Sequence, residues 1–174
     1  ILANGALSGG GEEYKIRRKL IENDLVEAIV ILPQNMFYTT GISVTLWILN
    51  KNKKEKTVQL PDETRQYRNR ENEILFLDLR QKGIPFEKKY TQFSENDIRK
   101  IAHTYHSWQM AVHSVETRQL GMRQLETRQL ETRQLETRHA TSLQEHEYKN
   151  IPEFCYSANI DEISKKDFSL VPSK

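Results

Sequence analysis

The chain has 174 residues, of which 37% are hydrophobic and 29% are charged, and its formal net charge is only +2. This balance argues against a strongly basic nucleic-acid-binding protein, although a local basic patch is enough for such contact. The single cysteine, Cys155, excludes an internal disulfide, and no apolar run has the length of a membrane span. We therefore expect a protein of the cytoplasm with no membrane partner. The first residue is Ile1 and not Met, so we also expect an internal fragment of a longer protein.

The first third of the chain predicts one helix and two buried strands. Residues 12–23 carry apolar side chains at the spacing of an amphipathic helix. Residues 26–32 are almost all apolar and rich in β-branched side chains, which is typical of a strand covered on both faces in a parallel sheet. Pro33 ends this strand, a loop with two adjacent aromatic residues follows at 34–42, and residues 43–49 form the second strand. The polar run NKNKKEK that comes next predicts a solvated turn.

The later part of the chain predicts a third strand and two further helices. Residues 74–79 are the strand, and residues 94–110 have apolar side chains at helical spacing. Ser94 and Asp97 indicate a capping box at the start of this helix, with Asp in place of the usual Glu or Gln. An extended piece after residue 150 leads into a short helix at 161–166. The order of these elements favours an α/β sheet with an antiparallel addition at its end.

Residues 116–138 repeat a unit of five residues, ETRQL with one variant copy. Five residues advance an α-helix by about 140° beyond one full turn, so the repeated leucines spiral around a helix instead of forming one face. The pattern is therefore not a coiled-coil seam. We interpret it as an insertion that is either an exposed helix or disordered, and we assign it no chemistry. The alternative interpretation is a helix that binds a partner protein.

The order of these segments resembles the modification subunit of type I restriction–modification enzymes. The resemblance is carried by the stretch from Ala3 to Lys53, by ENEILFLDLR and SENDIRKIAHTYHSW, and by FCYSANIDEISKKDFSLVPSK. Its most specific piece is LP-x-x-x-FY-x-T-G-I at Leu32–Ile42, which is followed by a buried strand and Asn-Lys. The resemblance covers almost the whole chain except the five-residue repeat.

The resemblance implies an N6-adenine DNA methyltransferase that uses S-adenosyl-L-methionine as methyl donor. It implies DNA as substrate, and as partners a specificity subunit, a restriction subunit and a second modification subunit. The fold it implies is an α/β, doubly wound methyltransferase sheet with an antiparallel strand, plus helical C-terminal segments. The strand after Ile42 is then the antiparallel strand, paired with the strand that ends at Leu32.

Two motifs of the family are absent from this sequence. Gly9–Gly11 lack the preceding strand and the spacing of the donor-binding motif, and no two prolines are adjacent, which excludes the Asn/Asp-Pro-Pro-Tyr/Phe catalytic motif. Both motifs precede this segment in the family. We therefore predict that residues 1–110 are the C-terminal portion of the methyltransferase domain, that 111–147 are the insertion, and that 148–174 begin a C-terminal region. The chain alone is then expected to be inactive, with no catalytic and no cofactor-binding residue of its own. The rival hypothesis is a non-catalytic remnant or split subunit that acts as a protein-interaction piece.

Phe37 is the candidate for stacking on the target base. A base must leave the duplex stack before it can be methylated, and an aromatic face replaces the stacking that it loses. The resemblance places Phe37 in the loop that supplies this face, with Tyr38, Thr40 and Gly41 as candidate walls of the pocket. The alternative is that Phe37 packs into the core with Tyr38 covering it, and that Gly41 serves a turn through its backbone angles.

Other residues are less specific candidates. His103, His106 and His113 lack a positioned carboxylate, so we predict no metal site. Arg17–Lys19 are either a solvated helix face or a weak contact with the DNA backbone. Cys155 has no neighbouring base and reads as a buried, inert thiol.

Overall fold

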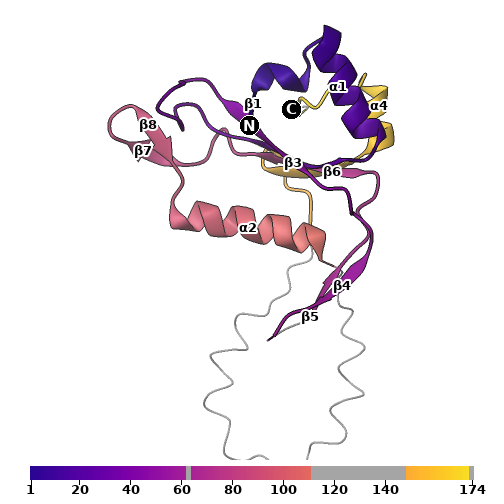
Figure 1. Ribbon diagram of the computed structural model, residues 1–174. Helices are drawn as coiled ribbons and strands as arrows, with labels where there is room; N and C mark the ends of the chain where they lie inside the picture. Colours follow the sequence, from indigo (N-terminus) through magenta and orange to yellow (C-terminus); the bar gives the residue numbers. More distant parts are fainter. Residues whose placement is uncertain (62–63, 111–147, 173–174) are drawn as a thin grey trace, which may run out of the picture.

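The computed structural model describes residues 1–61, 64–110 and 148–172, and its centre is a five-stranded mixed sheet (Figure 1). The strand order is β1-β3-β2-β6-β9. The strands are β1 (Leu2–Ala3), β2 (Val26–Ile31), β3 (Val44–Leu49), β6 (Glu73–Asp78) and β9 (Cys155–Asn159). Two small hairpins stand outside the sheet and consist of β4 (Lys56–Gln59) with β5 (Thr64–Tyr67), and β7 (Ile84–Phe86) with β8 (Tyr90–Gln92).

The predicted antiparallel pairing of the two apolar strands is confirmed. β3 runs antiparallel to β2, with Ile29 opposite Trp47 and Ile31 opposite Thr45. β2 runs parallel to β6, while β9 is antiparallel to β6 and β1 is antiparallel to β3. The expected α/β class with a mixed sheet is therefore confirmed. Among the described strands, β2 and β6 are the one parallel pair.

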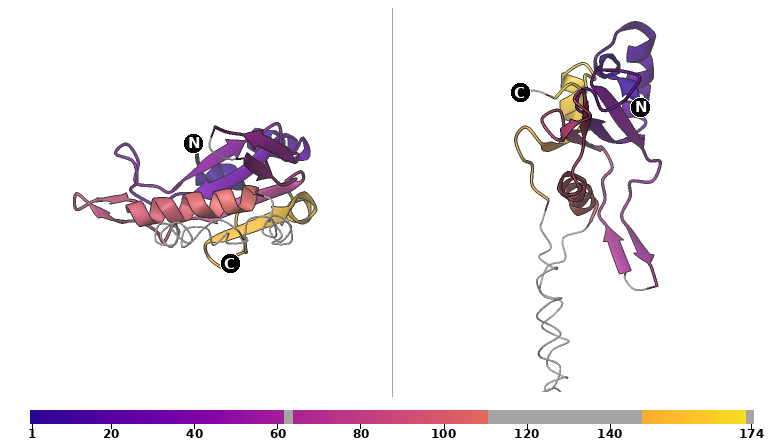
Figure 2. Two further views of the ribbon diagram at one scale, coloured as in Figure 1. Left: turned by 90° about the horizontal axis from the view of Figure 1, so that it is seen from below. Right: turned by 90° about the vertical axis from the view of Figure 1, so that its left-hand side faces the viewer.

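Helices cover both faces of the sheet (Figure 1 and Figure 2). The first face carries the 3-10 helix η1 (Asn4–Leu7), α1 (Gly11–Glu22) and α4 (Ile160–Lys165), and the second carries α2 (Glu95–Gln109). None of the helices in the described part of the chain is both long and apolar enough to span a bilayer.

Side chains of β2 alternate between the two cores, which explains why nearly all of them are apolar. Ile29 and Ile31 join the core under α1 and α4, whereas Ala28 and Val30 join the core under α2. Successive side chains of a strand point to opposite faces, so a strand covered on both sides must be apolar at almost every position. All six residues of β2 are buried accordingly.

The predicted start of α2 is confirmed in atomic detail. The Ser94 hydroxyl accepts a hydrogen bond from the Asp97 amide at 3.1 Å, and the Ser94 amide donates to the Asp97 carboxylate at 3.0 Å. Aspartate thus completes the reciprocal capping box in place of the usual longer acid. This geometry lowers the pKa of Asp97, first through the hydrogen bond from the Ser94 side chain and then through the Ser94 amide.

The segment after residue 148 belongs to the same sheet and cores as residues 1–110. β9 pairs with β6 from Glu73–Asn159 to Leu77–Cys155, and Ile163 of α4 is buried in the core under α1. The predicted short helix at 161–166 is confirmed as α4. The domain boundary that we place at residue 148 remains a prediction. The five-residue repeat lies outside the described residues.

A buried ionic network overturns part of the sequence interpretation. Glu27 lies within the apolar strand and is 3% exposed, and Arg70 is 1% exposed; Arg70 Nε lies 3.1 Å from Glu27 Oε1. Lys53, expected in a solvated turn, is instead 2% exposed. Its ammonium group bonds to the Asp24 carboxylate and donates to the carbonyls of Val26 at 3.0 Å and Glu73 at 2.8 Å. Burial of these charges is possible because each one has a partner.

Candidate functional site

The carboxyl ends of the two parallel strands, β2 and β6, meet at the same edge of the sheet, where a cleft of about 680 Å³ opens. Ligands of open α/β sheets bind at this kind of position. The cleft is lined by residues that follow the two strands, by one residue of η1 and by the β7–β8 hairpin. They are Asn4, Pro33, Gln34, Asn35, Ser43, Arg80, Gln81, Lys82, Gly83, Ile84, Pro85 and Thr91.

Local hydrogen bonds fix the chain as it leaves β2. The Ser43 hydroxyl donates to the carbonyl of Leu32, and the Leu32 amide donates to Val44 at 2.9 Å, so the strand stays paired up to Pro33. Asn35 then adopts a left-handed backbone conformation with φ of 58°. Its carbonyl accepts a hydrogen bond from the Thr91 amide at 2.9 Å, which joins the loop at 34–42 to the β7–β8 hairpin.

Phe37 is half-buried and packs against the core under α2, which also contains Trp108. This contact agrees with the packing alternative, and its role at a target base stays a prediction. Tyr38 is 68% exposed and lies edge-to-face against Tyr90, with ring centroids 4.5 Å apart.

Thr40 and Gly41 close the turn of the same loop. The Thr40 amide donates to the Phe37 carbonyl at 3.3 Å. The idea that Gly41 is needed for its backbone angles is wrong, because Gly41 is not among the glycines with positive φ. A Cβ atom at Gly41 would lie 3.0 Å from the Asn35 side-chain oxygen, so a larger residue there requires the Asn35 side chain to shift.

Gly83 fixes how the β7–β8 hairpin sits beside the cleft. Its φ is 95°, and a Cβ atom would lie 2.8 Å from Thr91 Cγ2 and 2.9 Å from the Gln92 carbonyl oxygen. We expect Gly83→Ala to destabilise the fold by about 1–3 kcal/mol, through both strain and overlap with the backbone. Urea unfolding measures this loss. Gly5→Ala is the control, because nothing lies within 4 Å of its added Cβ; equal effects of the two substitutions would contradict the close-packing explanation.

An ion pair sets the electrostatics at the end of β6. Arg80 Nε donates to Asp78 Oδ1 at 2.9 Å, and a second guanidinium nitrogen contacts the other carboxylate oxygen. Burial by itself raises the pKa of Asp78, but the hydrogen bonds and charge of Arg80 outweigh it, and the pKa lies below that of an ordinary aspartate. Asp78 therefore stays ionised near neutral pH and is unsuited to donating a proton there. Amide, guanidinium and ammonium side chains line the cleft, and the charge of Arg80 is paired with Asp78, so the lining suits a polar ligand.

The glycine-rich segment does not fit a donor or phosphate site. A Cβ atom at Gly9 would lie 2.0 Å from a carboxylate oxygen of Glu13, so a negative charge lies beside Gly9 and disfavours a phosphate there. Arg17, expected on a solvated face, is 3% exposed and donates to the carbonyls of Ala6, Gly9 and Phe168. Arg17 therefore pins this segment to the C-terminal part of the chain.

The family model for N-6 DNA Methylase matches residues 1–174, the whole chain. The chain belongs to the N-6 DNA methylase family.

Several known methylase subunits are similar to this family member along its length. The type I restriction enzyme HindI methylase subunit of Haemophilus influenzae is 31% identical over 175 residues, covering 100% of this chain and 28% of that protein. The MjaVIII methylase subunit of Methanocaldococcus jannaschii is 28% identical over 98% of this chain and 21% of that protein. The chain thus spans between a fifth and a third of the length of these relatives.

A solved structure has the same fold. The type I restriction–modification system methyltransferase subunit from Streptococcus thermophilus superposes with a TM-score of 0.61 and 20% identity, covering 98% of this chain and 24% of that one. At this identity the likeness concerns the fold, and it supports the mixed α/β sheet.

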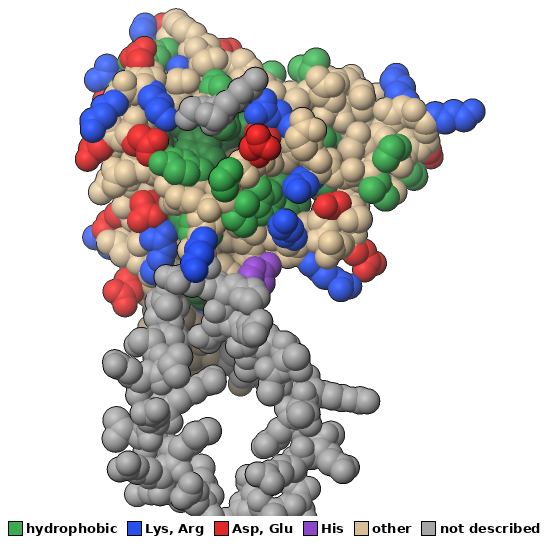
Figure 3. All heavy atoms as spheres, turned by 180° about the vertical axis from the view of Figure 1, so that it is seen from behind, with side chains coloured by type: hydrophobic (Ala, Val, Ile, Leu, Met, Phe, Trp, Pro, Cys, Tyr) green, Lys and Arg blue, Asp and Glu red, His purple; other side chains and the backbone are tan. Residues whose placement is uncertain are grey.

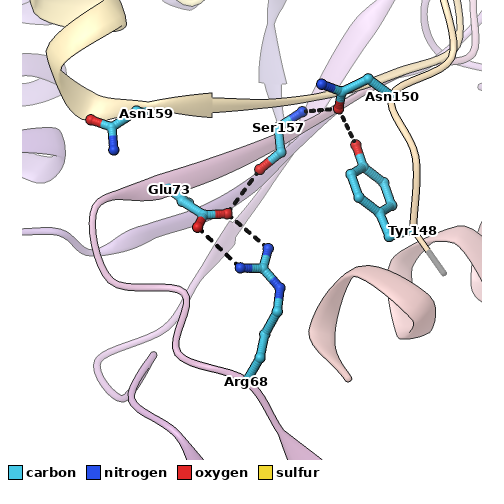
Figure 4. A pocket seen from close by; sticks show the side chains of 6 residues that line it. All are labelled: Arg68, Glu73, Tyr148, Asn150, Ser157 and Asn159. Carbon is cyan, nitrogen blue, oxygen red and sulfur yellow. Dashed lines mark hydrogen bonds and ion pairs between the residues drawn. The ribbon is translucent and has the colours of Figure 1, made fainter. Parts of the chain in front are cut away.

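A second pocket, of about 380 Å³, is lined by side chains that form a hydrogen-bond network (Figure 4). It joins β9 and the preceding segment to β6 and the residues after β5. Arg68 donates to both oxygens of Glu73 at 3.0 and 2.7 Å, and the Ser157 hydroxyl donates to Glu73 at 3.1 Å. Asn150 Oδ1 accepts from the Tyr148 hydroxyl and from the Ser157 amide, both at 2.9 Å. One of these bonds occupies the Ser157 amide of the edge strand β9, which leaves one backbone donor fewer for pairing with another chain.

The histidines and Cys155 were the other candidate residues in the sequence. Within residues 1–61, 64–110 and 148–172, no group of three His, Cys, Asp or Glu side chains is placed to hold a metal ion. His103 and His106 lie on α2, and His113 lies outside the described residues. Cys155 is buried, as predicted, and its thiol donates to the Lys149 carbonyl at 3.5 Å. The sequence analysis missed Gly83 and the β7–β8 hairpin. A signal for this hairpin is present in the sequence, because Gly83 is followed by two aromatic residues, Phe86 and Tyr90, on either side of the pair Lys88–Lys89.

Proposed function

We propose that this chain is the C-terminal portion of the catalytic domain of an N6-adenine DNA methyltransferase from a type I restriction–modification system. One observation carries the proposal: the family model matches residues 1–174, yet the chain covers only 28% of the HindI methylase subunit and contains no adjacent prolines. The catalytic amide and the site for S-adenosyl-L-methionine then come from residues outside this sequence. S-adenosyl-L-methionine supplies the methyl group when it is bound at that site.

The contribution of this chain is one wall of the target-base pocket. The loop at 34–42 leaves the carboxyl end of β2, the kind of position where α/β sheets bind ligands. Phe37 offers a ring at the edge of a packed core, which holds the ring in place, and stacking on such a ring is worth about 1–3 kcal/mol per base. Tyr38, Thr40 and Gly41 shape the loop around it. DNA, a specificity subunit, a restriction subunit and a second modification subunit are the proposed partners.

A chimera tests the proposal. The matching segment of the HindI methylase subunit is replaced by this chain, and transfer of labelled methyl groups to adenine in DNA is measured together with the cognate specificity subunit. We expect transfer by the chimera and none by the isolated chain. A folded chimera that binds DNA and its partner subunit but transfers no methyl groups would favour the protein-interaction alternative. Methyl transfer by the isolated chain would refute the assignment of donor and catalytic residues to other parts of the protein.

A further inference from the structure

The loop at 34–42 and the β7–β8 hairpin form a single structural unit, which we name the loop–hairpin projection. The Thr91 amide donates to the Asn35 carbonyl at 2.9 Å, and the rings of Tyr38 and Tyr90 meet edge-to-face with an interplanar angle of 67°. A rigid connection follows, because the hydrogen bond and the ring contact hold the hairpin beside the loop that carries Phe37. In Figure 1 the hairpin extends away from the sheet on the side opposite β4 and β5.

The tip of the projection carries more positive than negative charge. The hairpin at 84–92 contains Lys88 and Lys89 but only one carboxylate, Glu87, whereas the preceding Arg80 is paired with Asp78. Several exposed cations on or near the helices form ion pairs, as in Arg18–Glu22 of α1, Arg99–Glu95 of α2 and Lys166–Glu162 near α4. Figure 3 shows Lys and Arg side chains at the outer end of the molecule where the hairpin lies.

Lys88 and Lys89 stand at the tip of the hairpin. Both are exposed, and in the part of the chain that the structure describes neither forms a salt bridge; Lys89 lies 5.7 Å from the centre of the Tyr90 ring. Glu87 and Lys88 have φ of 45° and 59°, a left-handed conformation that hairpin tips usually assign to Asn or Gly. Two long charged side chains therefore occupy positions where the backbone favours other residues. Such local conflicts are expected at functional sites.

We propose that the tip of the loop–hairpin projection contacts the phosphates of duplex DNA through Lys88 and Lys89. The Tyr38–Tyr90 pair is the positioning element that keeps the tip at a fixed place relative to the loop at 34–42. The inference rests on the proposed function, since that loop faces the target base only in a DNA methyltransferase. Lysine contacts with phosphates supply affinity that is independent of sequence and sensitive to salt.

Two substitutions at adjacent positions test the contact. Glu87→Asn and Lys88→Asn both place Asn, which tolerates positive φ, and both change the charge by one unit in opposite directions. Binding of the full 174-residue chain to a fluorescent duplex of mixed sequence is measured by anisotropy over a series of salt concentrations. We expect Lys88→Asn to weaken binding roughly threefold and to make the salt dependence shallower by about 0.9 in log–log slope, the value for one phosphate contact. Glu87→Asn is expected to strengthen binding.

If the two variants change the DNA affinity in opposite directions, the effect is due to charge. A purely structural effect would change the affinity of both variants in the same direction. Lys15→Gln on α1 is the control for removal of a distant surface charge and is expected to leave the affinity within experimental error. No binding by the unaltered chain at low salt, or equal changes in Lys88→Asn and Lys15→Gln, would overturn the proposal. Since the assay needs no methyl transfer, its failure is distinct from failure of the proposed function, which the chimera measures.

Discussion

Glu27→Ala is expected to destabilise the chain by about 3–5 kcal/mol, the cost of leaving a buried charge without its partner. Arg70 is 1% exposed and would lose the carboxylate that lies 3.1 Å from its Nε. The Tyr105 hydroxyl and the Asn50 amide donate to the same carboxylate at 3.2 and 3.0 Å and would lose their acceptor as well. Urea unfolding followed by circular dichroism measures the change in the free energy of unfolding.

Two comparisons sharpen this experiment. Glu22 forms an i,i+4 pair with Arg18 at the surface, so Glu22→Ala should cost less than about 1 kcal/mol. The double variant Glu27→Leu with Arg70→Met replaces both charges by apolar side chains and should recover much of the stability lost in Glu27→Ala. If Glu27→Ala is no more destabilising than Glu22→Ala, the network does not hold β2, α2 and the segment after β5 together.

Phe37→Ala in the chimera is expected to lower the rate of adenine methylation by about 5- to 150-fold, which corresponds to the loss of about 1–3 kcal/mol of stacking. The ring also packs against the core under α2, so removing it has a structural cost that must be separated from stacking. Phe37→Leu keeps most of the apolar volume but has no aromatic face. Methylation rates and the fluorescence of 2-aminopurine at the target position report catalysis and base flipping for each variant.

A stacking role predicts that Phe37→Leu loses nearly as much activity as Phe37→Ala while its thermal unfolding stays close to that of the unaltered protein. A packing role predicts that Phe37→Leu restores both activity and stability. Tyr38→Ala provides the comparison within the loop, because Tyr38 is 68% exposed and contacts Tyr90 instead of the core. A loss of methylation in Tyr38→Ala with unchanged Phe37→Ala kinetics would transfer the stacking role to Tyr38.

Elements with a strong local signal could be predicted from the sequence. The almost entirely apolar run at 26–32 predicted β2 as a strand buried on both faces, because successive side chains point to opposite faces and each face packs against a core. Ser94 and Asp97 located the start of α2, because the capping box involves residues only three positions apart. The motif from Leu32 to Ile42 indicated the family, which the match over residues 1–174 shows.

The candidate site depended more heavily on tertiary contacts. The sequence located Phe37 after a strand end, but not its packing against the core or the contact of Tyr38 with Tyr90, which lies 52 positions further along the chain. The β7–β8 hairpin escaped prediction because its strands span Ile84–Phe86 and Tyr90–Gln92, too short for a period-two pattern, and one contains a proline. Its place beside the cleft follows from the bond between Thr91 and Asn35.

The sequence by itself indicated the buried strands and the cap of α2, because these depend on residues close together in the chain, and the resemblance to the family implied the antiparallel pairing of β2 and β3. The tertiary structure alone decided which charges are buried. Arg17, Lys53 and Arg70 look like surface residues in a polar context, yet each is at most 3% exposed. A charged side chain can be buried only where partners surround it, and those partners, such as Glu27 for Arg70 and the carbonyl of Phe168 for Arg17, are brought close only by the completed fold.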